Sequence, residues 1–179
     1  MIELTGYRLA QKSEVISLYL NVFSDSEGES EGRLIGLLVE EMIAKTPAED
    51  LIGFIAQSGR ATVGCIFFSR VWVPSGQEAF ILSPVAVQTQ SQRQGIGQQL
   101  IRYGLDDLKR RAVDLVFTYG DPHYYGKFGF KQLSESVMQA PCKLSQPEGW
   151  MVQSLKGEAI KRMQGRVSCI KPLNDPTYW

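Results

Sequence analysis

A glycine-containing turn at residues 92–97 constrains the fold of this 179-residue chain more than any other feature. It reads Gln-Arg-Gln-Gly-Ile-Gly and stands between a β-forming stretch that ends at Val87 and apolar residues that recur at helical spacing from Ile96 to Leu108. Glycine lets a backbone approach a ligand closely, and the N–H groups at the start of a helix have no partner within the helix. A strand, turn and helix of this kind suit a phosphate group, to which Arg93 would add a positive charge.

Two well-known phosphate-binding patterns fit this turn less well. A nucleotide P-loop needs Gly-Lys-Ser or Gly-Lys-Thr at the end of its turn, and neither occurs here. A dinucleotide fingerprint needs a third glycine where Leu100 stands, although Asp114 lies about 20 residues further on, as that motif prefers. A helix start that binds no ligand remains the alternative to a phosphate site.

The pattern of apolar residues predicts an α/β (α+β) fold with a mixed sheet. Pro84 stands inside one expected strand and has no N–H to donate, so we expect the sheet to open locally there. The expected elements are a strand at 7–10, helices at 15–23 and 34–42, a hairpin of strands at 51–56 and 61–73, a strand at 78–87, a helix at 95–111, a strand at 115–119, a turn or short helix at 124–128, and strands at 130–133, 151–155 and 167–170.

Composition and cysteine spacing narrow the class of protein. The chain is 44% hydrophobic and 21% charged, with no repeat or low-complexity tract, which predicts one globular domain over residues 1–179. No apolar run approaches the roughly 20 residues of a membrane span, and no secretory signal opens the chain. The three cysteines are far apart, which argues against a disulfide framework and a Cys-x-x-Cys metal site. We therefore expect a cytoplasmic protein without a membrane partner or a metal.

The formal charge is balanced overall but uneven along the chain. Nineteen basic and nineteen acidic residues give a net charge of zero, which excludes a generally basic protein that coats nucleic acid. Residues 1–56 hold ten acids against four bases, a net charge of −6, so the remainder carries +6. This asymmetry indicates either two solvated faces or two ligands of opposite charge.

The turn resembles the acetyl-CoA signature of the GNAT N-acetyltransferase superfamily, in which Gln or Arg is followed by two residues, Gly, one residue, and Gly or Ala. Gln92, Gly95 and Gly97 match it. Residues 82–87 are similar to the family's fourth strand, and residues 121–130 resemble its segment ending in Tyr-x-x-x-Gly-Phe. The resemblance covers about residues 80–133 and is nearest to a bacterial predicted-acetyltransferase group with Asp-Pro-x-Tyr-Tyr-Gly in the second motif.

The resemblance implies a GNAT-like, mostly antiparallel central sheet, flanked by helices and splayed between its fourth and fifth strands. Acetyl-CoA would be the co-substrate, with its pantetheine arm along the fourth strand and its pyrophosphate at the turn. The alternative for Val85 and Val87 is ordinary core packing. The implied cofactor-binding residues are Val85, Ala86, Val87, Gln92, Arg93, Gln94, Gly95, Ile96, Gly97 and Gln98.

The resemblance also places Tyr125, four residues before Gly129, at the position of the family's general acid. A phenol with a pKa of about 10 stays protonated at neutral pH and can donate to a thiolate whose conjugate acid has a pKa of about 8.5. The neighbouring Tyr124 is easily confused with it, and both rings could instead serve packing alone. His123, the single histidine, is a second catalytic candidate, as a base or a substrate contact, or else a loop residue.

In this family the acceptor commonly binds near the first two helices and their connection. Here that connection is expected to be a loop at residues 25–31, in which Glu27, Glu29 and Glu31 would attract a cationic amine. A solvated, mobile loop is the alternative.

Together these features predict an acetyl-CoA-dependent N-acetyltransferase that moves an acetyl group to a primary amine by direct attack in a ternary complex. The expected partner is a small-molecule or peptide amine that carries a positive charge, and no nucleic acid is expected. The charge and motifs leave open whether the chain forms a homodimer. Two alternatives remain: a CoA-binding regulatory or partner-binding module without turnover, and general phosphate or nucleotide binding.

Overall fold

The central elements of the chain lie where the sequence predicts them. The computed structural model describes all 179 residues. Strand β4 spans Glu78–Val87, helix α3 spans Ile96–Arg110, and strand β5 spans Leu115–Tyr119. Lys109 and Arg110 occupy the last turn of α3, where cations complement the helix dipole.

The first strand differs from the expected one. Strand β1 is Ile2–Gly6, and residues Leu9–Gln11 form a 3-10 turn, so the strand expected at 7–10 is wrong. β1 runs antiparallel to β2 (Leu51–Ser58), with Ile2 opposite Ser58 and Gly6 opposite Phe54. The strand depends on hydrogen bonds to residues about fifty positions away, which local propensity does not reveal.

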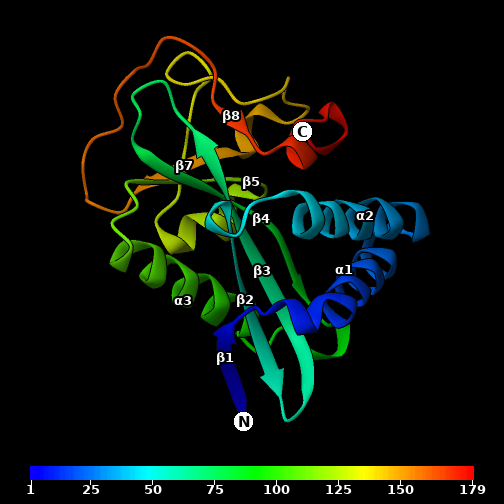
Figure 1. Cartoon of the computed structure of the whole chain (residues 1–179). Coiled ribbons are helices and arrows are strands. Elements are labelled where there is room, and N and C mark those ends of the chain that lie inside the picture. Colours follow the sequence, from blue (N-terminus) through cyan, green and yellow to red (C-terminus); the bar gives the residue numbers. More distant parts are fainter. The chain divides into compact units, whose positions relative to one another are not determined.

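Helices α1 (Lys12–Glu27) and α2 (Glu29–Lys45) follow each other almost directly and lie side by side (Figure 1). Gly28 alone separates them, with a φ of 100° that favours glycine. The loop expected at residues 25–31 is therefore wrong. A Cβ atom at Gly32 would come within 2.5 Å of the Leu20 carbonyl oxygen, so this glycine allows the two helices to approach closely.

The chain divides into two compact units, one of residues 1–68 and 84–104, the other of residues 69–83 and 105–179. Strands β3 (Ala61–Trp72) and β4 and helix α3 pass through both units. The strand order of the eight-stranded sheet is β1-β2-β3-β4-β5-β7-β6, with β8 (Ser168–Cys169) paired to β3. Whether the chain is a single domain stays a prediction.

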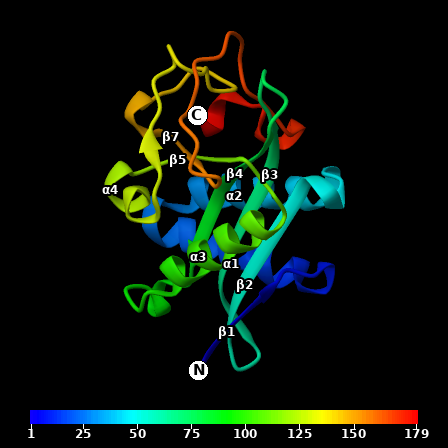
Figure 2. The same cartoon turned by 90° about the vertical axis from the view of Figure 1, so that its left-hand side faces the viewer.

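In the first unit, helices cover both faces of β3 (Figure 2). The Phe67 ring stacks against Tyr19 of α1, with ring centroids 6.2 Å apart. Phe68 points to the opposite face, where a Cβ atom at Gly104 of α3 would come within 2.4 Å of its ring. Successive side chains of a strand point to opposite faces, so these two neighbours join two helices to one strand.

In the second unit, β4 pairs in parallel with β5 from Ala79 opposite Leu115 to Leu82 opposite Thr118. The pairing stops there, although β4 continues to Val87. β5 is antiparallel to β7 (Trp150–Ser154), which is antiparallel to β6 (Lys131–Gln132). The predicted fold class, including the opening between the fourth and fifth strands, is confirmed.

The C-terminal segment packs on this second unit through aromatic rings. Trp150 stacks on Phe117 with ring centroids 5.0 Å apart, and Trp179 meets Trp150 edge to face at 5.9 Å. The Trp179 indole N–H donates to the Leu173 carbonyl oxygen at 2.8 Å. The remaining short helices are α4 (Pro122–Tyr125) and 3-10 turns at Ala48–Asp50, Thr89–Ser91, Gly126–Phe128, Pro147–Gly149, Lys171–Leu173 and Pro176–Tyr178. No helix of the chain combines the length and apolar character that crossing a bilayer requires.

Candidate functional site

The free end of β4 is held by helix α1. The Tyr19 hydroxyl donates to the carbonyl oxygens of Pro84 and Cys65, each at 2.9 Å, and Tyr19 is fully buried. Val85 and Val87 are half-buried, whereas Ala86 is buried. Sequence reasoning treated Tyr19 only as one of the apolar residues of the first helix. Tyr19 also has a polar role, because a buried phenol hydroxyl needs a hydrogen-bond partner and here finds it on β3 and β4.

The turn after β4 combines a short 3-10 segment with two left-handed residues. Arg93 has a φ of 62° and Gly95 a φ of 78°, and Arg93 is exposed. The Gln92 side-chain amide donates to the Val87 carbonyl oxygen at 3.0 Å, so this amide ties the turn to the end of the strand. Gln99 donates its N–H to the Gly95 carbonyl oxygen at 3.0 Å and so begins the helical ladder.

The start of α3 therefore offers N–H groups to an anion. The N–H groups that precede Gln99 in the helix have no helical carbonyl to bind. A Cβ atom at Gly95 would find only the Gln99 side-chain nitrogen within 4 Å, at 3.8 Å, so the space beside this backbone is open. The geometry, together with the Arg93 charge, can hold a phosphate or pyrophosphate group.

In the second unit, helix α4 places Tyr125. Asp121 caps this helix by accepting the His123 N–H at 2.9 Å, and Pro122 follows as its first residue. The Tyr125 ring meets Phe130 edge to face at 5.9 Å and Tyr124 at 5.2 Å.

The end of β5 provides room for this ring. A Cβ atom at Gly120 would lie 2.7 Å from the Tyr125 ring, so only glycine permits the observed approach. Thr118, two residues earlier, points to the same face of the strand and donates its hydroxyl to the Leu82 carbonyl oxygen at 3.0 Å. This bond occupies the Leu82 carbonyl at the last paired position of β4 and β5.

Burial raises the pKa of Tyr125 to about 12, and the neighbouring Tyr124 and Asp121 act in the same direction, while a side-chain hydrogen bond with Thr118 opposes them. Burial also raises the pKa of Tyr124, whose ring contacts Phe128 with centroids 5.4 Å apart. Tyr125 is therefore a phenol that stays protonated at neutral pH. The His123 side chain is exposed.

The three acids expected near the acceptor lie at helix ends rather than in a loop. Glu27 is the last residue of α1, and Glu29 and Glu31 are in the first turn of α2. Glu29 forms an exposed ion pair with Arg33, one turn along, at 3.3 Å. Acids in a first turn stabilise a helix through its dipole, so Glu29 and Glu31 have a structural role whatever else they do.

The structure brings the sequence-predicted residues into two groups. Residues 85–87 and 92–98 adjoin in the first unit, and His123 and Tyr125 share one short helix in the second. Sequence reasoning missed Tyr19, Thr118 and Gly120, although a glycine directly before the second motif was a usable signal.

Comparisons with known proteins agree with these motifs. Residues 49–132 match the family model described as an acetyltransferase (GNAT) domain. The chain is 28% identical over 141 residues to the uncharacterized N-acetyltransferase YjhQ of Escherichia coli K12, a match that covers 75% of this chain and 77% of that protein. It is 27% identical over 149 residues to the uncharacterized N-acetyltransferase YhbS of the same organism, which covers 79% of this chain and 81% of that protein.

Solved structures share the fold. The GNAT family N-acetyltransferase YhbS from Escherichia coli, solved in complex with CoA, has a TM-score of 0.83 at 22% identity and covers 97% of this chain and 92% of its own. A GNAT family acetyltransferase from Brucella melitensis, solved in complex with acetyl-CoA, has a TM-score of 0.74 at 23% identity and covers 96% of this chain and 97% of its own. The predicted resemblance is confirmed: residues 49–132 match the model of a GNAT acetyltransferase domain, and the chain has the fold of the solved GNAT acetyltransferases.

Proposed function

We propose that this protein is an acetyl-CoA-dependent N-acetyltransferase that transfers the acetyl group to a primary amine by direct attack. The observation that carries the proposal is the pairing of two motifs in one chain: a glycine-containing turn at residues 92–97 that opens helix α3, and the half-buried Tyr125, whose raised pKa keeps it protonated, at the position that the resemblance gives to the general acid. Two relatives of the same fold are solved with CoA or acetyl-CoA, which supports the choice of donor.

In this proposal, residues of the first unit bind the donor. The N–H groups at the start of α3 and the Arg93 guanidinium bind the pyrophosphate. The unpaired end of β4, residues 85–87, offers its backbone to the pantetheine arm, and the Val85 N–H polarises the acetyl carbonyl. The side chains of Val85 and Val87 then matter less than the direction of their backbone.

Tyr125 completes the transfer by donating its proton to the departing thiolate. A phenol whose pKa is raised to about 12 is fully protonated at neutral pH, as a general acid must be. The thiol that forms has a pKa of about 8.5, below that of the phenol, so the transfer is uphill by about 5 kcal/mol, and the tyrosinate that it leaves regains its proton from water.

The acceptor amine must lose a proton before it attacks. For an alkylamine with a pKa near 10.4, this costs about 4 to 5 kcal/mol at pH 7. His123 is exposed and is proposed as the group that passes this proton to solvent. Glu27, Glu29 and Glu31 are proposed to favour a cationic acceptor through their charge.

The cysteines argue for direct attack over an acetyl-cysteine intermediate. Burial raises the pKa of Cys65 and Cys142, and it raises the pKa of Cys169 to about 12. All three are therefore thiols at neutral pH, and a thiol is a much weaker nucleophile than a thiolate.

The test measures thiol release from acetyl-CoA across a panel of primary amines and peptides, with calorimetric binding of CoA and ATP alongside. We expect turnover with at least one amine and a strong preference for CoA over ATP. Tight CoA binding without turnover on any amine would favour a regulatory module instead. Equal affinity for CoA and ATP would favour general nucleotide binding.

A further inference from the structure

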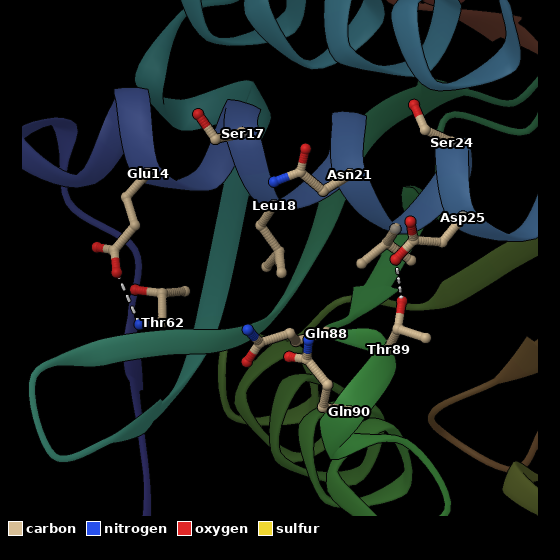
Figure 3. A pocket seen from close by; sticks show the side chains of 11 residues that line it. Glu14, Ser17, Leu18, Asn21, Ser24, Asp25, Thr62, Gln88, Thr89 and Gln90 are labelled. Atoms are coloured by element: carbon tan, nitrogen blue, oxygen red, sulfur yellow. Dashed lines mark hydrogen bonds between the residues drawn. The ribbon is translucent and has the colours of Figure 1, made fainter. Parts of the chain in front are cut away.

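A groove of about 380 Å³ lies in the first unit, between one face of α1 and a wall formed by the start of β3 and the residues that follow β4 (Figure 3). The side chains of α1 that line the groove recur at helical spacing and therefore share one face of that helix. The opposite wall includes Thr62 and residues 88–90. None of the residues assigned above to the acetyl donor or to the general acid lines it.

The groove carries a carboxylate toward each end and no basic side chain. Glu14 and Asp25 are eleven positions apart on α1, which places their Cα atoms about 16 Å apart along the helix axis. Glu14 Oε1 accepts the Thr62 backbone N–H at 2.7 Å, and Asp25 Oδ2 accepts the Thr89 hydroxyl at 2.6 Å. These bonds fix both carboxylates and use one oxygen of each, which leaves the second oxygen for a ligand.

A second observation points to a ligand independently of this charge. The Thr62 side chain is only 7% exposed, and its hydroxyl oxygen has no hydrogen-bond partner. Figure 3 draws this hydroxyl on the side of the Glu14 carboxylate. A buried hydroxyl without a partner is unfavourable, and a ligand N–H next to Glu14 would give it one.

The middle of the groove is neither charged nor wholly polar. Leu18 and Val22 give it an apolar strip, and Ser17 and Asn21 add a hydroxyl and an amide from the same helix. No three His, Cys, Asp or Glu side chains gather anywhere to hold a metal ion, and the two carboxylates are too far apart to share one. The pattern suits a long molecule with cationic ends, aliphatic segments and internal N–H groups.

We propose that this groove binds a linear polyamine, with one terminal ammonium at Glu14 and Thr62 and the other at Asp25. The methylene segments lie over Leu18 and Val22, and the internal amines face Ser17 and Asn21. The proposal concerns binding alone and does not rest on the proposed acetyl transfer.

The test is calorimetric titration of the protein with spermine at physiological ionic strength, without acetyl-CoA. We expect saturable binding of one spermine per chain. We also expect butane-1,4-diamine, which is too short to reach both carboxylates, and magnesium chloride to bind at least tenfold more weakly. Glu14→Gln and Asp25→Asn remove one charge each but keep an oxygen to accept the existing hydrogen bond, so each should weaken spermine binding at least tenfold with little change in Tm.

Two further variants distinguish binding in this groove from non-specific attraction of spermine to acidic side chains. Glu40→Gln removes an exposed acid of α2 outside the groove and should leave spermine affinity unchanged. Thr62→Val removes the unpartnered hydroxyl, so it should leave the fold at least as stable while it weakens binding severalfold. Absence of saturable spermine binding, or equal weakening by Glu40→Gln and the groove variants, overturns the proposal. Because no acetyl donor is present, failure here is distinct from failure of the acetyltransferase proposal.

Discussion

The chemistry proposed at Tyr125 depends on its immediate surroundings. Burial and the neighbouring Tyr124 and Asp121 favour the neutral phenol, and the Thr118 hydroxyl, which is already bonded to the Leu82 carbonyl, opposes them only in part. The raised pKa keeps the donating form fully populated at neutral pH, and it also makes the phenol a weaker acid toward the thiolate.

Replacing Tyr125 by Phe should lower kcat by about 100-fold or more and leave KM for acetyl-CoA nearly unchanged, because proton donation operates in the transition state. Steady-state thiol release measures both constants. Tyr124→Phe is the matched control, since it removes the adjacent hydroxyl, and it should keep most of the activity. Full activity of Tyr125→Phe would remove this residue from the acid role.

Gly120→Ala should disturb the same acid without touching its hydroxyl. The added Cβ would stand 2.7 Å from the Tyr125 ring, so the ring must move, at a cost of about 1 to 3 kcal/mol. We expect a lower Tm and a lower kcat. Gly126→Ala, six residues later and with nothing within 4 Å of its Cβ position, should change neither. Equal kcat for the two variants would mean that Gly120 does not position Tyr125.

At the scale of single elements, the turn between β4 and α3 combines conformational strain with proposed donor binding. Gly95→Ala places a side chain at a φ of 78° and beside the N–H groups of the helix start. We expect it to destabilise the fold by about 1 kcal/mol and to weaken CoA binding at least tenfold by calorimetry.

The control for this variant is Gly59→Ala in the β2–β3 turn. Gly59 has a φ of 62° and nothing within 4 Å of its Cβ position, so its substitution imposes a similar strain away from α3. It should lower Tm comparably and leave CoA affinity unchanged. If both variants bind CoA alike, the turn is an ordinary helix start.

The junction of α1 and α2 has a structural and a proposed functional role that can be separated. Neutralising Glu27, Glu29 and Glu31 together should raise KM for a cationic amine, with a smaller effect at high salt because salt screens exposed charges. Arg33→Gln is the control for stability, because it breaks the pair with Glu29 without neutralising an acid. An unchanged KM in the triple variant would leave Glu29 and Glu31 with their helix-stabilising role alone.

At the scale of the whole molecule, the segment after residue 133 has no motif in the sequence, yet it supplies part of the core. Trp179 is 6% exposed and meets the rings of Trp150 and Tyr119. We expect Trp179→Ala to cost about 3 to 5 kcal/mol in a chemical denaturation experiment.

Trp72→Ala is the matched control for that loss. Trp72 is 48% exposed, so its truncation should cost less than 1 kcal/mol. Similar losses in the two variants would show that burial of Trp179 contributes little to stability.

The uneven charge of the chain takes on a more specific meaning in the structure. Much of the negative charge of residues 1–56 lies on α1 and α2, where Glu14 and Asp25 face the groove and Glu29 and Glu31 begin α2. Part of the asymmetry therefore belongs to helix termini, and part to a surface suited to a cation.

The sequence by itself determined the elements that local patterns specify. The apolar spacing of α3, the β-forming run of β5 and the proline within β4 were sufficient, because each signal lies within a few residues of the element it describes. The paired motifs around Gly95 and Tyr125 likewise predicted the resemblance to GNAT acetyltransferases that the match over residues 49–132 confirms.

The tertiary structure alone decided which distant residues meet. β1 forms at Ile2–Gly6 because β2 is its partner, and a single glycine at position 28 is enough to separate two packed helices. Glu14 meets Thr62, and Asp25 meets Thr89, across 48 and 64 positions of chain. The physical reason is that hydrogen bonding and burial between remote segments outweigh local propensity, and these contacts exist only once the chain has folded.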